Sequence, residues 1–280
     1  MCLLIAVSGV LPGTPLLVAA NRDERYDRPA EVMAVLRERR PRILGGRDKV
    51  AGGTWLAVNS RGLVAGLTNQ PSGRPRDEGR RSRGELPLAF AAYPDAATAV
   101  AAVCAELDPS DYNPCWLLVG DRHALYSVGM AAGHRPAVRL LPPGIHVLEN
   151  VPPEADSAKA RQVKQLVAAG IAKTTRDNGA NGADAAHRGG DLEAALAAVL
   201  RDHRPAAGHA GQGAADGLHR PAGLSAACVH TAGYGTRSAM IVTVGDAGLP
   251  RVLAADGPAC QAPFGDFTAL WRGAGVSRRT

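Results

Sequence analysis

The pattern of apolar and polar residues predicts strands at both ends of the chain and helices between them. Two apolar runs, residues 2–9 and 15–22, flank the turn-forming pair Pro12-Gly13 and predict a buried β-hairpin. A second hairpin is predicted from GGTWLAV (52–58) and LVAGLTN (63–69), which flank the turn sequence NSRG. Apolar runs predict further strands at 116–119, 124–128, 137–141, 145–148, 225–231, 238–244 and 250–256.

Helical patterns occupy the middle of the chain. Ser82 and Glu85 have capping-box spacing before an alanine-rich stretch, which predicts a helix to about Leu107. Two more helices are predicted at about 154–170 and 191–203, whereas 174–190 and 205–223 are rich in glycine and polar residues. Strands and helices do not alternate regularly, so we expect an α+β fold of antiparallel sheets covered by helices. We expect one domain over 1–280, with a flexible low-complexity insertion at about 174–223.

The N-terminal run admits two interpretations, a secretion signal or a mature N-terminus. No basic residue precedes Arg22, and Pro12-Gly13 interrupts the run, so a signal peptide is not expected. No stretch approaches the roughly 18 apolar residues of a membrane-spanning helix. We therefore expect a cytoplasmic protein without a membrane span, in which removal of Met1 makes Cys2 the first residue.

Composition and charge narrow the classes of function. The net charge of +6 favours anionic partners, but no nucleic-acid motif, P-loop or G-x-G-x-x-G sequence is present, so no nucleic-acid partner is expected. The arginine-rich run 74–83 is either a solvated loop or a rim that binds carboxylates or phosphates. Five cysteines without a C-x-x-C pair argue against a disulfide framework. Cys228 and His230 share one face of a predicted strand. We expect both side chains to face the core or the pocket, and we expect no metal ion to bind to them.

The first hairpin places candidate chemistry at one end. A turn centred between Pro12 and Gly13 pairs residues whose numbers add up to about 25, which puts Cys2 opposite Asp23 and beside Arg22 and Asn21, give or take one residue. A thiol is a nucleophile as thiolate, which a nearby cation favours, and a free α-amine can act as its base. The alternative is a structural Arg22–Asp23 ion pair with Cys2 at a strand edge.

The second hairpin adds a possible oxyanion donor. Its turn brings Gly52-Gly53 opposite Thr68 and Asn69, where glycine allows close backbone approach. An Asn69 side-chain amide can donate to the oxyanion of an acyl-transfer reaction. It can equally be a turn residue after the strand.

Six motifs together resemble the NRDE family, the family of the transport and Golgi organisation protein 2. They are NRDE (21–24), GRDKVAGGTWLAV (46–58), LTN (67–69), SRGEL (82–86), YNPCWLLVGD (112–121) and YGTRS (234–238). This family is similar to N-terminal-nucleophile (Ntn) hydrolases, a resemblance that implies a four-layer αββα sandwich. It also implies catalytic roles for Cys2, Arg22, Asp23, Asn69, Asn150 and Arg237. We place Asn21, Gly53, Thr54, Thr68 and His230 on the substrate side of that site.

These features predict a cysteine hydrolase or acyl transferase acting on an amide or thioester. Its ligand is a small acyl or amide compound and no cofactor is required. The alternative, implied by the same resemblance, is a carrier of haem, bound non-covalently because no C-x-x-C-H motif is present, or of lipid or acyl-coenzyme A. A third possibility is an interaction protein with a vestigial site. The sequence does not predict the oligomeric state.

Overall fold

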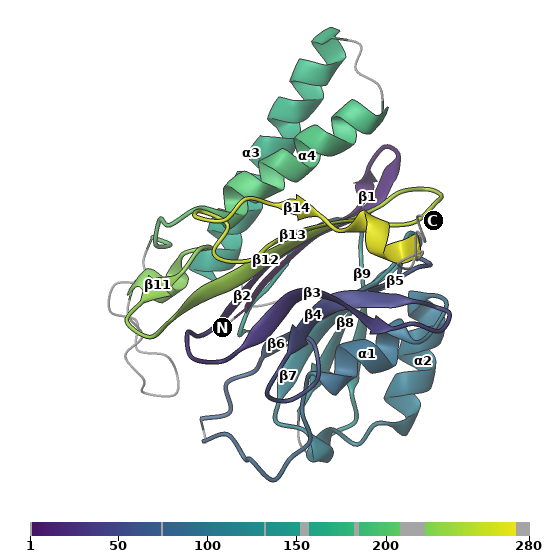
Figure 1. Ribbon diagram of the computed structural model, residues 1–280, viewed down its shortest axis with the longest axis vertical. Coiled ribbons are helices and arrows are strands. Elements are labelled where there is room, and N and C mark those ends of the chain that lie inside the picture. Colours follow the sequence, from purple (N-terminus) through teal and green to yellow (C-terminus); the bar gives the residue numbers. More distant parts are fainter. Residues whose placement is uncertain are drawn as a thin grey trace, which may run out of the picture.

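The computed structural model of the protein describes residues 2–73, 75–131, 133–151, 157–181, 185–207 and 222–272. In these ranges two antiparallel sheets lie face to face between two pairs of helices (Figure 1). The helices are α1 (Glu85–Ala91), α2 (Ala96–Glu106), α3 (Ala158–Asn181) and α4 (Ala185–Leu200), with single 3₁₀ turns at Pro109–Asp111, Ala222–Ser225 and Thr268–Arg272.

The first sheet has the order β10-β1-β2-β12-β13-β14, and β11 pairs with the N-terminal end of β12. Its strands are β1 (Cys2–Leu11), β2 (Thr14–Arg25), β10 (Gly144–Leu148), β11 (His230–Thr231), β12 (Tyr234–Val244), β13 (Arg251–Ala255) and β14 (Gly265–Asp266). The second sheet follows chain order from β3 to β9. Its strands are β3 (Ala30–Arg37), β4 (Ile43–Asp48), β5 (Leu56–Asn59), β6 (Val64–Asn69), β7 (Cys115–Gly120), β8 (Leu125–Met130) and β9 (Ala137–Leu141).

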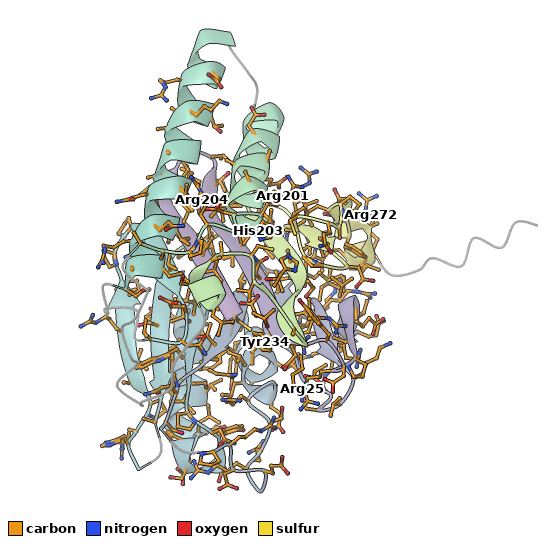
Figure 2. All side chains as sticks on the ribbon, turned by 90° about the vertical axis from the view of Figure 1, so that its left-hand side faces the viewer. Arg25, Arg201, His203, Arg204, Tyr234 and Arg272 are labelled. Carbon is orange, nitrogen blue, oxygen red and sulfur yellow. The ribbon has the colours of Figure 1, made fainter. Side chains whose placement is uncertain are left out.

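Three apolar clusters separate the four layers. On β1, alternate side chains point to opposite faces, so Leu3 and Ile5 pack with Leu196 of α4, while Leu4 packs with Leu56 of the second sheet. The third cluster joins the outer face of the second sheet to α1 and α2. Figure 2 shows α3 and α4 side by side on the first sheet, which they alone cover among the described helices. The predicted α+β, four-layer αββα sandwich is confirmed.

The first hairpin forms as predicted, but its register shifts by one residue along β1. Leu11 pairs with Thr14 beside the turn, and Ser8 pairs with Leu16 further on. One extra residue therefore lies in β1 between these pairs, at a bulge that includes Gly9 with a left-handed φ of 66°. As a result Cys2 lies opposite Arg22 and not Asp23, so Cys2 and Arg22 share a face of the sheet.

The second hairpin also forms, without the predicted contact at its open end. β5 begins only at Leu56, which pairs with Gly66, so Gly52-Gly53 do not lie opposite Thr68 and Asn69 in a strand ladder. Gly53 instead packs on the backbone of Gly84, where an added Cβ would lie 2.5 Å from the carbonyl carbon. This close approach explains the glycine without any contact to Thr68.

Several predicted elements have different limits. The alanine-rich helix is two helices, and α2 starts anew at an N-cap, Asp95, whose side chain accepts a hydrogen bond from the Thr98 N–H. The Ser82–Glu85 capping box does not form, since Gly84 is the N-cap of α1 and Glu85 pairs with Arg81. The expected loop at 174–190 is helical where it is described, in α3 and α4, while 208–221 lie outside the described residues.

Near the C-terminus, the strand predicted at 225–231 shortens to the two residues of β11, because a 3₁₀ turn and bends precede it. Strands β3 and β4 were not predicted from the sequence. None of the described helices combines the length and the apolar character needed to cross a membrane.

Candidate active site

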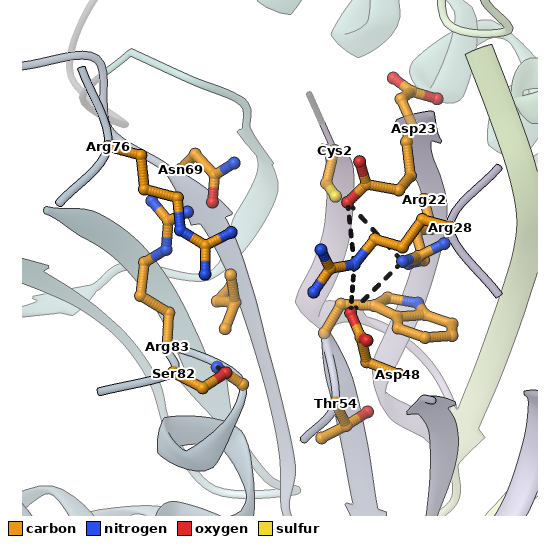
Figure 3. A pocket seen from close by; sticks show the side chains of 14 residues that line it. Cys2, Arg22, Asp23, Arg28, Asp48, Thr54, Asn69, Arg76, Ser82 and Arg83 are labelled. Atoms are coloured by element: carbon orange, nitrogen blue, oxygen red, sulfur yellow. Dashed lines mark hydrogen bonds and ion pairs between the residues drawn. The ribbon is translucent and has the colours of Figure 1, made fainter. Parts of the chain in front are cut away.

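A pocket opens where the free end of the first hairpin meets the end of β6 and the segment that leads into α1. Its empty volume is about 640 Å³, including the part open to solvent. Figure 3 shows Cys2, Arg22 and Asp48 on one side and Asn69, Arg76 and Arg83 on the other. The lining residues are Cys2, Arg22, Asp23, Glu24, Arg28, Asp48, Thr54, Trp55, Leu67, Asn69, Arg76, Ser82, Arg83 and Gly84.

Arg22 is a fixed cation next to the Cys2 thiol. Its side chain is only 4% exposed and lies 4.7 Å from the Trp55 ring centre, in cation–π geometry. Its Nη2 lies 3.6 Å from Asp48 and 3.7 Å from Glu24, and Asp48 also accepts a 2.8 Å bond from Arg28. Stacking and ion pairing on several sides therefore hold the guanidinium in place at the pocket wall.

Asp23 lies next to Cys2 through its backbone, while its side chain points to the layer of α3. The carboxylate accepts a 2.7 Å hydrogen bond from the Thr236 hydroxyl. Burial raises the pKa of Asp23, and the positive charge of Lys159 opposes that rise. Lys159 is itself buried, on α3, and sequence reasoning missed it because nothing distinguishes it from the other basic residues of that helix.

The Cys2 thiol is half-buried, and loss of water is the main influence on it. Desolvation raises the pKa of Cys2 and the Asp23 carboxylate raises it further, while the backbone N–H of Asp23 and the charge of Arg22 lower it. The thiol is thus protonated at neutral pH, and any reaction through its sulfur requires a base that takes the proton.

This raised pKa predicts the pH dependence of Cys2 labelling. Because only the thiolate reacts, the rate of alkylation by iodoacetamide should keep rising with pH beyond about 8.5, the ordinary cysteine pKa. Peptide mapping over a pH series measures it, with Cys104, whose pKa burial raises to about 11, as the slower internal reference. A rate at Cys2 that levels off below pH 8 would contradict this assignment.

Asn69 and Asn150 come together at the adjoining ends of the two sheets. The side-chain amide of Asn150 donates to the Asn69 carbonyl at 2.9 Å, and the Thr68 hydroxyl donates to the Glu149 carbonyl at 2.6 Å. Asn69 itself lines the pocket, whereas Thr68 and Asn150 do not. Asn150 and Thr68 therefore hold the end of β6 in place, and of these three residues only Asn69 lines the pocket.

Two further arginines lie opposite the thiol. Arg83 donates to the Pro114 carbonyl at 3.2 Å, and burial together with the charge of Arg76 lowers its pKa. Among the described residues, neither Arg76 nor Arg83 forms an ion pair. Thr54 donates its backbone N–H to the Gly84 carbonyl, and both residues line the pocket. This side of the pocket therefore carries positive charge that the described carboxylates do not neutralise.

Gly53, Thr68 and Asn150 do not line the pocket, and three further predicted site residues also lie outside it. Asn21 is fully buried, and its side-chain amide donates to the carbonyls of Leu200 and Ala227 at 2.9 and 2.8 Å. A bulge in β12 turns Arg237 outward, where it donates to the carbonyls of Tyr26 and Arg25. His230 belongs to a separate cluster at the edge of the first sheet. The structure therefore does not bring these three residues to the Cys2 pocket, and their expected substrate or catalytic roles stay predictions.

Together, the layers and the pocket define the class: an αββα sandwich of antiparallel sheets with a half-buried cysteine at the start of its first strand. The chain belongs to the Transport and Golgi organisation 2 family, whose sequence model matches residues 1–253. It is 45% identical over 75 residues to the Transport and Golgi organization 2 homolog of Mus musculus, and 44% identical over 80 residues to the Homo sapiens homolog. The match to the Mus musculus homolog covers 25% of this chain and 26% of that relative, and the match to the Homo sapiens homolog covers 27% and 28%, so each spans only about a quarter of both proteins.

Among solved structures, the chain is distantly similar to three hydrolases. A mutant conjugated bile acid hydrolase from Clostridium perfringens aligns with a TM-score of 0.49 and 10% identity, over 96% of this chain and 93% of that one. The N-acylethanolamine-hydrolyzing acid amidase ortholog of Caenorhabditis elegans aligns with a TM-score of 0.47 and 13% identity, over 68% of this chain and 85% of that one. Penicillin V acylase from Agrobacterium tumefaciens aligns with a TM-score of 0.44 and 14% identity, over 95% of this chain and 86% of that one.

Proposed function

We propose that this protein is a cysteine hydrolase or acyl transferase that cleaves an amide or thioester through Cys2. The observation that supports this most directly is the half-buried Cys2 thiol, which faces the pocket beside the fixed Arg22 guanidinium. A thiol that served only packing would not need a buried cation held by two carboxylates and an indole ring. The proposed reaction requires no cofactor.

In the proposed mechanism, removal of Met1 frees the Cys2 α-amine. The amine takes the thiol proton as Sγ attacks the substrate carbonyl carbon, which forms a C–S bond and a tetrahedral oxyanion. The Asn69 amide donates to that oxyanion, and Arg22 stabilises the negative charge that develops on sulfur as its proton leaves. The protonated amine then gives its proton to the leaving amine or thiol, the carbon–heteroatom bond breaks, and an acyl-thioenzyme remains. Water, deprotonated by the same amine, hydrolyses it and restores the free thiol.

The positive side of the pocket suggests which substrates fit. Arg76 and Arg83 face the thiol across the pocket and are free to bind an anionic group, a carboxylate or a phosphate, on the substrate. Replacing both with glutamine should lower kcat/KM for an anionic acyl substrate by about 10–100-fold, and for its neutral analogue by less than about threefold. Steady-state kinetics with such a matched pair measure the difference. Equal losses for both substrates would show that the two arginines do not contact the anionic group.

Trapping of the acyl-enzyme tests the proposed reaction. The protein is mixed with a panel of acyl amides and thioesters, with and without an anionic group, and is quenched in acid for mass analysis. We expect one acyl adduct, located on Cys2 and released by hydroxylamine, together with free acid in solution. The absence of both adduct and acid across the panel, combined with tight binding of haem or acyl-coenzyme A, would favour a carrier instead.

A further inference from the structure

A second group of reactive side chains lies outside the Cys2 pocket, where three separate segments meet. His203 follows α4, Cys228 and His230 lie before and within β11, and Cys260 follows β13. Their ligand atoms all lie within 4.8 Å of one another. Figure 2 shows His203 near Arg201 and Arg204, where the chain leaves α4. The sequence pattern connects only Cys228 and His230, because His203 and Cys260 are about 25 to 30 residues away from them.

The spacing of these atoms matches the first coordination shell of a tetrahedral ion. The two sulfurs are 3.7 Å apart, and His230 Nε2 lies 3.7 Å from Cys228 Sγ and 3.3 Å from Cys260 Sγ. With Zn–S near 2.3 Å and Zn–N near 2.0–2.1 Å, a regular tetrahedron places two sulfurs about 3.8 Å apart and sulfur and nitrogen about 3.6 Å apart. Three of the ligand atoms already have this spacing around a common centre.

The fourth ligand, His203, makes a hydrogen bond of the kind that metal-bound histidines usually make. Its Nδ1 lies 3.3 Å from the Cys228 carbonyl oxygen, which can only accept, so Nδ1 carries the proton. Nε2 then keeps its lone pair for a metal. A histidine ligand whose other ring nitrogen donates to a backbone carbonyl is the usual arrangement around zinc. The His203 and His230 rings are also close, with centres 5.0 Å apart.

We infer that His203, Cys228, His230 and Cys260 form a structural site for a thiophilic divalent ion, Zn²⁺ by the chemistry of its ligands. Two thiolates and two imidazoles are a common zinc ligand set, and four protein ligands leave no open position for a catalytic water. Binding converts two thiols to thiolates and releases two protons to solvent. The ion would tie the end of α4 and the segment after β13 to the edge of the first sheet. This proposed zinc site differs from the expectation, drawn from the sequence, that Cys228 and His230 bind no metal.

The burial of the four residues suits a site loaded from solvent. Cys228 is buried and Cys260 half-buried, whereas both histidines are exposed. The ion would therefore sit at the surface, with its thiolates on the protein side and its imidazoles toward water. None of these residues lines the Cys2 pocket, so this inference does not depend on the proposed hydrolase activity.

Metal content and cobalt spectroscopy of the full chain test the inference. Protein purified with reductant should contain about one zinc per chain. Co²⁺ added to the reduced, metal-free protein should give the absorption of a tetrahedral thiolate site and saturate at one equivalent. Chelation should lower Tm by about 5–10 °C, and added Zn²⁺ should restore it.

Variants locate the ion. The double variant Cys228→Ser, Cys260→Ser should lose the zinc and the thiolate-to-cobalt absorption band. Each single histidine variant, His203→Gln or His230→Gln, changes an exposed position and should weaken cobalt binding at least about tenfold. Cys104→Ser with His134→Gln removes a thiol and an imidazole elsewhere and should keep both signals, as should Cys2→Ala. Failure of the reduced wild-type protein to bind Co²⁺ would overturn the inference, and so would cobalt bands that survive in the double cysteine variant. A Cys228–Cys260 disulfide whose reduction restores no metal binding would also overturn it.

Discussion

Replacing Cys2 with alanine is expected to lower acyl transfer by about a thousandfold or more, without unfolding the protein. The nucleophile forms the covalent intermediate in the proposed reaction, and no other described thiol lines the pocket. The side chain is small and half-buried at the start of β1 and belongs to none of the three apolar clusters, so its loss leaves them intact. Hydrolysis of the best anionic substrate measures the rate, and circular dichroism with thermal melting measures the fold.

The matched control is Cys104→Ala, which removes a half-buried thiol on α2, outside the pocket. This variant should hydrolyse the substrate at the wild-type rate. Retention of more than a tenth of the activity by Cys2→Ala would show that the hydrolysis does not proceed through this thiol. A similar loss in Cys104→Ala would point to a general effect of thiol removal and not to the site.

Asn21→Ala is expected to destabilise the fold by about 2–4 kcal/mol, with little effect on the chemistry of the molecules that remain folded. The fully buried Asn21 amide is a donor to two backbone carbonyls, those of Leu200 and Ala227, and alanine leaves both without that bond. Urea unfolding measures the loss, and alkylation of Cys2 at low temperature measures the site. We expect the labelling rate to stay within about threefold of wild type.

Asn69→Ala is the matched control and should give the opposite result. Asn69 is exposed at the end of β6, and its side chain lines the pocket, so its free energy of unfolding should change by less than about 0.5 kcal/mol. Its acyl-transfer rate should fall by about 10²–10³-fold if the amide binds the oxyanion. Should Asn21→Ala impair catalysis at unchanged stability, Asn21 would belong to the substrate site after all.

The sequence predicts the strands of the first sheet well because their signal is local. Long apolar runs on either side of Pro12-Gly13 leave few alternatives to a buried hairpin, and the observed β1 and β2 follow it. The register was missed by one residue because a single bulge near Gly9 shifts every later pair, and no residue pattern marks it. The helical part of 174–190 was missed because glycine and asparagine disfavour helices locally, although α3 and α4 include this stretch where it is described.

The candidate site was predictable only where its residues are neighbours in the sequence or across one hairpin. Cys2 and Arg22 satisfy this condition across the first hairpin, and Asn69 satisfies it at the end of the second hairpin, where the resemblance also places it. Arg237 follows the same family pattern, yet a bulge in β12 turns it away from the pocket. The link from Asn150 to Asn69 and the burial of Lys159 beside Asp23 join residues more than 80 positions apart, so no local pattern could reveal them.

The most direct test of the central claim is an intact-mass spectrum of the purified protein, before and after brief treatment with a thiol-directed acylating probe. We predict that Met1 is absent and that a single adduct forms, which peptide mapping places on Cys2. Retention of Met1, or an inert Cys2 while Cys104 or Cys228 reacts, would contradict an N-terminal cysteine nucleophile.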